Sequence, residues 1–350
     1  MSRFLQERFQ AFAAYVPGEQ PTGRQFIKLN TNESPYPPSP AVLASVTQEQ
    51  VARLNLYPPT DGIELMRGLA QTYGVDAENV IIGNGSDEVL AFAFLAFCGG
   101  GVVFPDITYG FYPVYARLYD LPFERIPLRD DFTIAPEDYF NAGRTIVIAN
   151  PNAPSGIALS LRDIEEIVKR NHDNVVLIDE AYVDFGAESA IPLVKKYDNL
   201  IVCHTYSKSR SMAGARLGYA IAQKPLIEDL NKMRFSFNPY SVNSLTQLMG
   251  LAALQDSGYY KDCHREIIKT REYTQTRLRE LGFLATDSRA NFVFAKHSDV
   301  PGSALYKKLR ERGILVRHFD APRISDYLRI TVGTPEQMQT LVDAFEDILK

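Results

Sequence analysis

Two short segments contain the residues with the clearest potential for chemistry. The apolar run VVLI ends at Asp179, which opens the sequence DEAY. A second apolar run, LIVCHT, precedes Lys208 in the segment TYSKSRSMAGARLGY. A carboxylate at one strand end can keep a pyridine nitrogen protonated, and a lysine amine after the next strand can form a Schiff base with an aldehyde. Alone, Lys208 would be an ordinary loop lysine, but the pair predicts a site for pyridoxal 5'-phosphate (PLP).

The segment GNGSDE lies where a strand is expected to lead into a helix. The backbone amides of Gly85, Ser86 and Asp87 would then surround a helix N-terminus, which favours anions such as phosphate. Capping of the helix by Ser86 explains part of the same pattern. We therefore expect phosphate binding here only together with Ser207 and Arg216, which can supply further donors.

Three other polar side chains follow expected strands and are candidates for contact with the cofactor ring. Tyr109, in DITYG, can stack on a ring, and Tyr182, in DEAY, can reach the 3′-oxygen of the ring. Asn152, in NPNAPSG, can donate a hydrogen bond to the same oxygen. Each has a simpler interpretation, which is packing for the tyrosines and turn formation for the asparagine. Neither a CxxC pair nor an HExxH segment occurs, so no metal site is predicted.

Two arginines in the last third of the chain are candidates for anion recognition. Arg317 and Arg329 lie on separate strand-like segments, and the planar fork of arginine suits a carboxylate or a phosphate. A surface salt bridge is the default interpretation of either residue. The apolar neighbours of Arg329 in YLRITVG favour a more buried role. No role is predicted for Arg323, a further cation nearby.

The elements that must position these residues alternate between short β-rich runs and helical patterns. The alternation predicts an α/β fold with a largely parallel sheet covered by helices on both faces. Ligands bind such sheets outside the carboxyl ends of the strands. GNGSDE, PNAPSG, DEAY and TYSK each follow an expected strand, so we expect them to form a single site. The expected strands are 80–82, 102–104, 145–149, 175–178, 200–204 and 219–222, and helices are expected at 87–97 and 161–169.

Changes of pattern divide the chain into three parts. Residues 1–45 include the proline-rich segment LNTNESPYPPSP and are predicted to form an extended arm that packs with the small domain. Residues 46–243 form the large PLP-binding domain. Residues 244–350 form a smaller α/β domain, entered through a long connecting helix near 244–280.

Composition and charge argue against several other classes of protein. The 350 residues are 45% hydrophobic and 23% charged, with a net charge of −5, which is ordinary for a soluble globular protein and gives no basic footprint for nucleic acid. No targeting peptide or long apolar span is present, so we expect a cytoplasmic protein without a membrane partner. Cys98, Cys203 and Cys263 are widely spaced in apolar segments and are expected to be buried free thiols.

A series of segments, in this order, resembles the fold-type I PLP enzymes of the class I/II aminotransferase group, and most closely the histidinol-phosphate aminotransferases. The resemblance implies an α/β fold-type I transferase whose large domain holds a mostly parallel seven-stranded sheet between helices. One departure is Ser241, where many members carry asparagine. The segments are YVPGEQP, KLNTNESPYPPSP, LYPP, GNGSDE, DITYG, NPNAPSG, DEAY, TYSKSRSMAGARLGY and LRITVGT, and they span nearly the whole chain.

By this resemblance, Lys208 would form the internal aldimine and move a proton at the substrate Cα, and Asp179 would bind the ring nitrogen. Asn152 and Tyr182 would hold the 3′-oxygen, and Tyr109 would stack on the ring. Lys208, Asp179 and Tyr182 are the expected catalytic residues. The residues expected around the cofactor phosphate are Gly85, Ser86, Asp87, Ser207 and Arg216.

The resemblance also implies residues that serve the substrate and the assembly. Tyr57 would reach the cofactor phosphate from a neighbouring subunit, which implies a homodimer with shared active sites. Tyr15, Asn32, Arg317 and Arg329 match substrate-contacting positions. The two arginines would bind the phosphate of one substrate or the carboxylate of the other.

The implied reaction is ping-pong transamination between L-histidinol phosphate and 2-oxoglutarate, which gives imidazole acetol phosphate and L-glutamate in histidine biosynthesis. An aromatic amino-acid aminotransferase and a PLP lyase similar to threonine-phosphate decarboxylase remain alternatives. A PLP-binding regulator would need an attached DNA-binding domain, which we do not expect.

Overall fold

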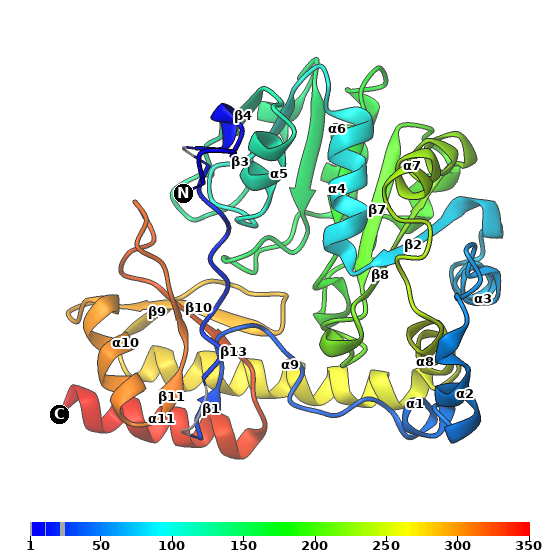
Figure 1. Ribbon diagram of the computed structural model, residues 1–350. Helices are drawn as coiled ribbons and strands as arrows, with labels where there is room; N and C mark the ends of the chain where they lie inside the picture. The colour runs from blue at the N-terminus through cyan, green and yellow to red at the C-terminus, as the bar shows by residue number, and fades with distance from the viewer. Residues whose placement is uncertain (1, 11, 22–24) are drawn as a thin grey trace.

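The computed structural model describes residues 2–10, 12–21 and 25–350. A seven-stranded sheet lies at the centre of its larger part (Figure 1). The strands are β2 (Val80–Asn84), β3 (Val102–Pro105), β4 (Phe123–Ile126), β5 (Thr145–Ala149), β6 (Val176–Asp179), β7 (Leu200–Thr205) and β8 (Leu217–Ala222). Their spatial order is β2-β8-β7-β6-β5-β3-β4, and only the pairs that involve β8 are antiparallel. The predicted mostly parallel seven-stranded sheet is confirmed.

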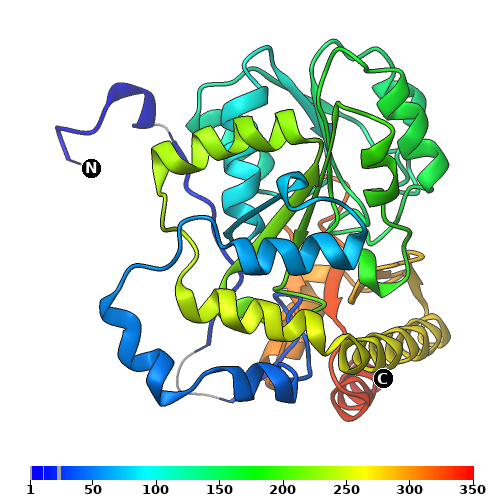
Figure 2. The ribbon, with the colours of Figure 1, turned by 90° about the vertical axis from the view of Figure 1, so that its right-hand side faces the viewer.

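Two apolar cores lie on opposite faces of this sheet, because successive side chains of a strand point to opposite faces. Leu177 of β6 belongs to the core under α4 (Ser86–Phe97), α5 (Tyr112–Leu118) and α7 (Lys224–Phe237). Ile178, the next residue, belongs to the core under α3 (Ile63–Tyr73), α6 (Leu161–Lys169) and α8 (Ser244–Gln255). In Figure 2, α3 (blue) and α8 (yellow-green) lie side by side against the near face of the sheet.

The six strands and two helices expected from the sequence are present, with bounds shifted by two residues at most. The strand β4 was not expected. Its sequence, FERI, has an exposed centre at Glu124 and Arg125, because β4 forms the edge of the sheet. An edge strand pairs through its backbone and needs no apolar run. The prediction of buried free thiols is also confirmed, since Cys98, Cys203 and Cys263 are buried and unpaired.

The smaller part contains a four-stranded antiparallel sheet with the order β12-β13-β10-β9. Helices α9, α10 and α11 enclose its apolar core, which includes Leu278, Phe283, Leu305 and Phe345. Figure 1 shows α9 running beneath both parts of the molecule. The bounds are β9 (Phe283–Ala285), β10 (Phe292–His297), β12 (Arg317–His318), β13 (Leu328–Thr331), α9 (Ser257–Glu280), α10 (Gly302–Glu311) and α11 (Pro335–Leu349).

The connection between the two parts is two helices and not the single helix expected near 244–280. Asp256, with φ −103° and ψ 44°, separates α8 from α9. Ala252 and Ala253 of α8 lie in the core of the larger part, and α8 contacts α1 (Pro40–Ser45) and α3. We therefore propose that α8 belongs to the large domain and that the small domain begins near Ser257.

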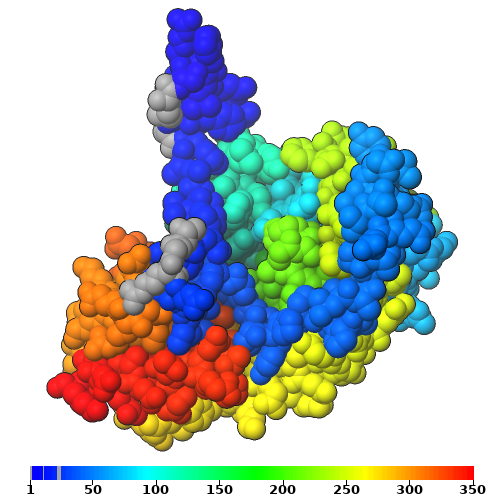
Figure 3. Space-filling model, turned by 60° about the horizontal axis from the view of Figure 1, so that its bottom comes forward, coloured from blue at the N-terminus to red at the C-terminus, as the bar shows by residue number. Residues whose placement is uncertain are grey.

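The N-terminal segment connects both parts. The short strand β1 (Ile27–Lys28) pairs in parallel with β11 (Ile314–Leu315) of the smaller part. The proline-rich segment that follows is non-helical until α1, which begins after the cap residue Ser39. Helix α2 (Gln48–Ala52) comes next. Residues 2–10 stand away from the body of the molecule (Figures 2 and 3).

Candidate active site

Lys208 lies in the loop that follows β7, with its side chain half-buried. Its Nζ atom donates a hydrogen bond to the main-chain oxygen of Thr31 at 3.0 Å. Burial and, after it, the positive charge of Arg329 lower the pKa of the Lys208 amine to about 8. A lysine with this pKa has a substantial neutral fraction near physiological pH, and the neutral amine is the nucleophilic form.

Asp179 is the last residue of β6 and is 4% exposed. Its Oδ2 atom accepts a hydrogen bond of 2.8 Å from the hydroxyl of Tyr112, and Oδ1 accepts one of 3.3 Å from the backbone N–H of Ala181. Burial raises the pKa of the Asp179 carboxyl to about 6. A cationic partner, such as a protonated ring nitrogen, would stabilise the charged form of a carboxyl group in this environment.

Lys208 and Asp179 line the same cavity, which has a volume of about 180 Å³. The cavity lies at the carboxyl ends of β6 and β7, where the topology of a parallel sheet places ligands. Most of the predicted cofactor-binding residues are therefore brought together. The lining of this cavity includes Ser86, Asp87, Tyr109, Asp179, Tyr182, Ser207, Lys208 and Arg216, as well as Thr31.

One end of this cavity is the N-terminus of α4. Gly85 has φ +80°, and a Cβ atom there would lie 2.5 Å from the Arg216 guanidinium, so glycine allows the close approach. Arg216 Nη2 donates to Asp87 Oδ2 at 2.8 Å, and the Tyr109 hydroxyl donates to Asp87 Oδ1 at the same distance. Ser207 is buried beside them. Free N–H groups at a helix start and an adjacent guanidinium suit a phosphate group.

The structure corrects the prediction for Asn152. Its amide nitrogen donates to the main-chain oxygen of Ile107 at 2.9 Å, and its Oδ1 accepts from Thr108 Oγ1 at 2.8 Å. Asn152 is 2% exposed, and both polar atoms of its side chain are hydrogen-bonded to the loop that contains Ile107 and Thr108. The residue of this turn that lines the cavity is Ala153, whose methyl group cannot donate a hydrogen bond. The asparagine therefore serves the turn, which was the simpler interpretation.

Tyr182 is linked to the N-terminal arm. Its hydroxyl accepts a hydrogen bond of 2.9 Å from Asn32 Nδ2, and burial raises the pKa of the phenol. Asn32 is 1% exposed, and its backbone N–H donates to Thr331 Oγ1 at 2.9 Å. Its main-chain oxygen accepts from Asn291 Nδ2 at 3.0 Å. Asn32 therefore ties the predicted Tyr182 site to strand β13 of the small domain.

A second cavity, of about 530 Å³, adjoins the first and shares Lys208, Tyr109 and Tyr182 with it. Its wall includes the four predicted substrate-binding residues, which come from the arm and from the small domain. They are Tyr15, Asn32, Arg317 and Arg329. The predicted cofactor and substrate residues, except Gly85, Asn152 and Tyr57, thus line two adjoining cavities.

Arg317 and Arg329 both lie near the same aromatic ring. The guanidinium carbon of each lies 5.6 Å from the ring centroid of Phe319. Arg329 Nη2 donates to the main-chain oxygen of Asn30 at 3.1 Å, and among the described residues its buried Nε has no hydrogen-bond partner. Burial lowers the pKa of Arg329, and the charge of Arg317 has the same effect. Two adjacent guanidinium groups with spare donors can bind an anion.

Comparisons with known proteins identify the family. A model of the family described as aminotransferase class I and II matches residues 24–345. The chain belongs to this aminotransferase family. It is 48% identical to the histidinol-phosphate aminotransferase of Brachyspira hyodysenteriae over the full length of both chains. It is 47% identical to that of Lactococcus lactis subsp. lactis, over 99% of this chain and 96% of the relative.

A solved structure of a related enzyme has the same fold as this aminotransferase. The histidinol-phosphate aminotransferase of Sinorhizobium meliloti, solved in complex with pyridoxal-5'-phosphate, matches it with a TM-score of 0.89. The match covers 99% of both chains at 22% sequence identity. The fold-type I architecture expected from the sequence is therefore confirmed.

Tyr57 lies apart from the two connected cavities of this aminotransferase. It is 80% exposed and stacks on Tyr240, with 4.3 Å between the ring centroids. It lines a separate cleft of about 540 Å³ with Leu56 and Leu248. Tyr57 does not line the Lys208 cavity of its own chain.

Tyr112, Thr31 and Arg323 are among the residues of the candidate site that were not predicted. Tyr112 donates a hydrogen bond to Asp179. The only feature of the sequence that could have indicated this role is the position of Tyr112 at the start of the helix that follows Tyr109. Thr31 contacts Lys208 through its backbone oxygen. Because every residue type has this oxygen, the sequence does not indicate the contact. Arg323 lines the 530 Å³ cavity, but its partners are distant in sequence.

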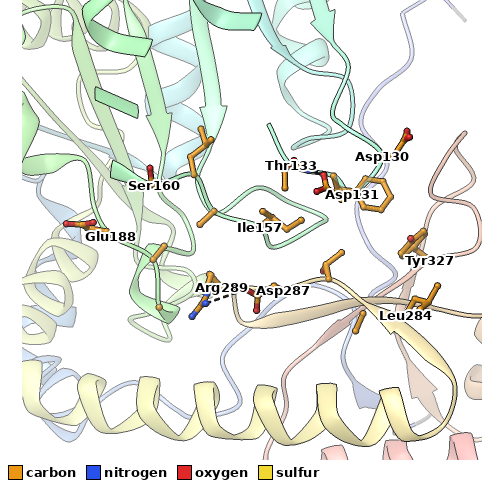
Figure 4. A pocket seen from close by; sticks show the side chains of 17 residues that line it. Asp130, Asp131, Thr133, Ile157, Ser160, Glu188, Leu284, Asp287, Arg289 and Tyr327 are labelled. Carbon is orange, nitrogen blue, oxygen red and sulfur yellow. Dashed lines mark hydrogen bonds and ion pairs between the residues drawn. The ribbon is translucent and has the colours of Figure 1, made fainter. Parts of the chain in front are cut away.

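Another cavity, of about 690 Å³, lies elsewhere on the aminotransferase (Figure 4). It is lined by Asp131, Thr133, Ile157, Glu188 and Tyr327 among others, and Asp287 and Arg289 form an ion pair of 3.4 Å in it. Lys208 and Asp179 lie outside this lining, so its size does not make it the catalytic site. In the described part of the chain, no group of His, Cys, Asp or Glu residues could hold a metal ion. None of the described helices has the length and apolar content needed to cross a membrane.

Proposed function

We propose that this aminotransferase transfers an amino group between L-histidinol phosphate and 2-oxoglutarate, with PLP as its cofactor. The products are imidazole acetol phosphate and L-glutamate. The observation that carries the proposal is the pair of connected cavities. One holds Lys208 and Asp179, and the other presents Arg317 and Arg329. The names of the relatives at 47 and 48% identity support the same substrate.

The residues of the smaller cavity fit PLP. Asp179 is a buried carboxylate at the position for a protonated ring nitrogen, and Lys208 is an amine with a lowered pKa. The start of α4, with Ser207 and Arg216, can hold the phosphate. When bound, PLP supplies an electron sink for the electrons released at the substrate Cα.

Each side chain then has a defined task. Lys208 Nζ removes the proton from the substrate Cα and later returns it, and a pKa near 8 suits both directions. Tyr109 would cover one face of the bound ring, and its hydroxyl is held by Asp87. Tyr182, held by Asn32, would supply a hydroxyl to the 3′-oxygen. Ala153, the residue of the adjacent turn that lines this cavity, has no polar side chain to offer that oxygen.

The larger cavity accommodates two substrates that arrive in turn. Arg317 and Arg329 would bind the phosphate of L-histidinol phosphate in one half-reaction and a carboxylate of 2-oxoglutarate in the other. A pair of planar forks can match either anion, because each guanidinium offers several donors. Tyr15, 38% exposed and packed on Phe111 with 4.6 Å between ring centroids, would close the outer side of the cavity.

We also propose that the enzyme is a homodimer whose partner subunit places Tyr57 at the cofactor phosphate. Tyr57 belongs to a surface of exposed apolar side chains contributed by α1, α2, the segment after α2, the end of α7 and the turn after α7. The surface comprises Leu43, Val51, Leu54, Leu56, Tyr57, Phe235, Phe237 and Tyr240. A patch of this kind favours association with a second copy. The three unpaired cysteines suit a reducing compartment, which supports a cytoplasmic location.

A panel of substrates tests the proposed function. Purified enzyme with PLP should use L-histidinol phosphate with 2-oxoglutarate at a kcat/KM well above that for L-phenylalanine. Release of carbon dioxide from O-phospho-L-threonine should not be detected. A higher kcat/KM for L-phenylalanine would identify an aromatic amino-acid aminotransferase, and carbon dioxide release would identify a lyase. Either result would overturn the proposed substrate.

A further inference from the structure

Arg323 connects the small domain to the large domain at the rim of the substrate cavity. It lies in the loop between β12 and β13 and has φ +69°, a backbone conformation that is unusual for a residue with a side chain. Its Nη1 donates to Asp106 Oδ2 at 3.0 Å. Its Nη2 donates to the main-chain oxygens of Leu128 and Arg129 at 2.9 and 2.8 Å. One guanidinium therefore makes three contacts with the large domain.

The acceptor Asp106 is itself held in place. Its Oδ1 accepts from the backbone N–H groups of Ile107 and Leu128, both at 2.9 Å, which leaves Oδ2 for Arg323. Asp106 directly follows β3 and precedes Tyr109, which lines both connected cavities. The large-domain end of the contact is therefore close in sequence to a residue of the cofactor site.

The other end of the contact is the loop that carries Phe319. The centroid of this ring lies 5.6 Å from the guanidinium carbon of Arg317 and from that of Arg329. Arg323 follows Phe319 in the same loop, and Ile324 lies in the core shared with the large domain. This loop therefore joins the two strands that carry the anion-binding arginines to the large domain.

We propose that Arg323 and Asp106 form an interdomain clasp that positions the anion-binding arginines over the cofactor site. Arg323 is a positioning residue, since its described contacts are with the large domain. This inference rests on the proposed function for the identity of the anions. Because Arg323 also lines the substrate cavity, the competing role is direct binding of the substrate anion.

Asp106→Asn separates these two roles. Asparagine keeps Oδ1 for the N–H groups of Ile107 and Leu128, and it places an amide nitrogen opposite the guanidinium of Arg323. The substitution thus breaks the clasp while Arg323 itself remains. Arg323→Gln removes the guanidinium, and Arg323→Lys keeps the charge with fewer contacts. Arg279→Gln, at an exposed position in the last turn of α9, is the matched control.

If the clasp positions the arginines, Asp106→Asn and Arg323→Gln should each raise KM for L-histidinol phosphate and for 2-oxoglutarate. The increase should be about 10-fold or more, as expected for loss of a charge-assisted hydrogen bond. The kcat should change less than KM, Arg323→Lys should be intermediate, and the double variant should be no worse than Arg323→Gln alone. Arg279→Gln should match the wild type.

Two outcomes would overturn the clasp. If Arg323 binds the substrate directly, Asp106→Asn would leave KM unchanged or lower it, since the guanidinium would be released toward the substrate. If the loop is held by its apolar contacts alone, neither Asp106→Asn nor Arg323→Gln would change KM. The clasp requires that Asp106→Asn and Arg323→Gln both raise KM and that the double variant shows less than the sum of their effects.

Binding of glutarate separates failure of the clasp from failure of the proposed function. Glutarate is an unreactive dicarboxylate, and its affinity for the PLP-loaded enzyme can be measured by calorimetry whatever the true substrate is. Wild type that binds glutarate but does not use L-histidinol phosphate would refute the proposed substrate and leave the clasp testable. Equal glutarate affinity in wild type, Asp106→Asn and Arg323→Gln would refute the clasp.

Discussion

The amine of Lys208 lies 3.0 Å from the backbone oxygen of Thr31, although one follows a strand of the large domain and the other belongs to the N-terminal arm. The next arm residue, Asn32, donates to the hydroxyl of Tyr182 at 2.9 Å. Two consecutive arm residues therefore contact two of the three predicted catalytic side chains. The arm is therefore part of the proposed active site and not only a link between domains.

The first prediction concerns the chemical role of Lys208. Lys208→Ala should reduce transamination by at least about 10⁴-fold, the upper range for loss of a general acid–base group, and here the attachment of PLP is lost as well. The visible absorption of the bound cofactor should become that of free PLP. Lys196→Ala, at an exposed site, is the control. Turnover by Lys208→Ala at the wild-type rate would refute the proposed mechanism.

The second prediction concerns pH. Because burial lowers the pKa of Lys208 to about 8, protein stripped of PLP should capture the cofactor faster as the pH rises through that value. The charge of Arg329 contributes to the lowering, so Arg329→Gln should move the profile to higher pH. Stopped-flow absorbance across this pH range measures both effects. Arg312→Gln should leave the profile in place, and a shift to lower pH in Arg329→Gln would contradict the assigned cause.

The third prediction separates function from folding at Asp179. Its pKa is raised from 3.8 to about 6, so the folded chain pays no penalty below the lower value. As the pH rises from 3.8 to about 6 the penalty grows to about 3 kcal/mol, at 1.36 kcal/mol for each unit of pKa, and it stays at that value above pH 6. Asp179→Asn should thus bind PLP weakly and be nearly inactive. Without PLP it should be as stable as wild type only below pH 3.8, and more stable at pH 7.

Chemical denaturation at the two pH values checks this prediction. The gain at neutral pH will be less than the full penalty, because the amide introduced by Asp179→Asn must still pair with the hydroxyl of Tyr112. A stability lower than that of the wild type at pH 7 would show that the carboxylate serves folding. Asp184, an exposed acid, has a lowered pKa, so Asp184→Asn should show the opposite sign.

Much of the fold could be predicted from apolar runs, because a parallel strand buried on both faces must be apolar throughout. β5 was expected with its observed bounds for this reason. β4 was missed because an edge strand keeps charged residues such as Glu124 and Arg125. The break between α8 and α9 was missed because the helical pattern continues across Asp256.

The candidate site was predictable where a residue type has a specific chemistry. It was less predictable where the direction of a side chain or a contact of the backbone decides the role. Lys208 and Asp179 were predicted from their types and their positions after strands, and both line the same cavity. Asn152 was assigned to the cofactor because the sequence identifies the turn but not which of its side chains faces inward, and Ala153 occupies that place. Thr31 acts through its carbonyl group, which every residue type possesses.

The last prediction tests whether two chains share each active site. Lys208→Ala lacks the amine, and Tyr57→Ala lacks the side chain proposed to come from the partner subunit. In a mixed dimer one site carries both substitutions and the other carries neither. Two-fold symmetry therefore predicts that subunits exchanged at equal amounts recover about a quarter of the wild-type activity, since about half of the dimers are mixed.

Each variant alone should show far less activity than the mixture, and Tyr57→Ala should remain dimeric in sedimentation experiments, with PLP bound more weakly. Tyr73→Ala would be a poor control because that side chain is buried on Tyr219. Tyr306→Ala, in the small domain, is suitable, and mixed with Lys208→Ala it should add only its own activity. If Tyr57 serves its own chain, the Tyr57→Ala and Lys208→Ala mixture would likewise show only the sum of its parts, because no dimer could then assemble an intact site from two defective chains.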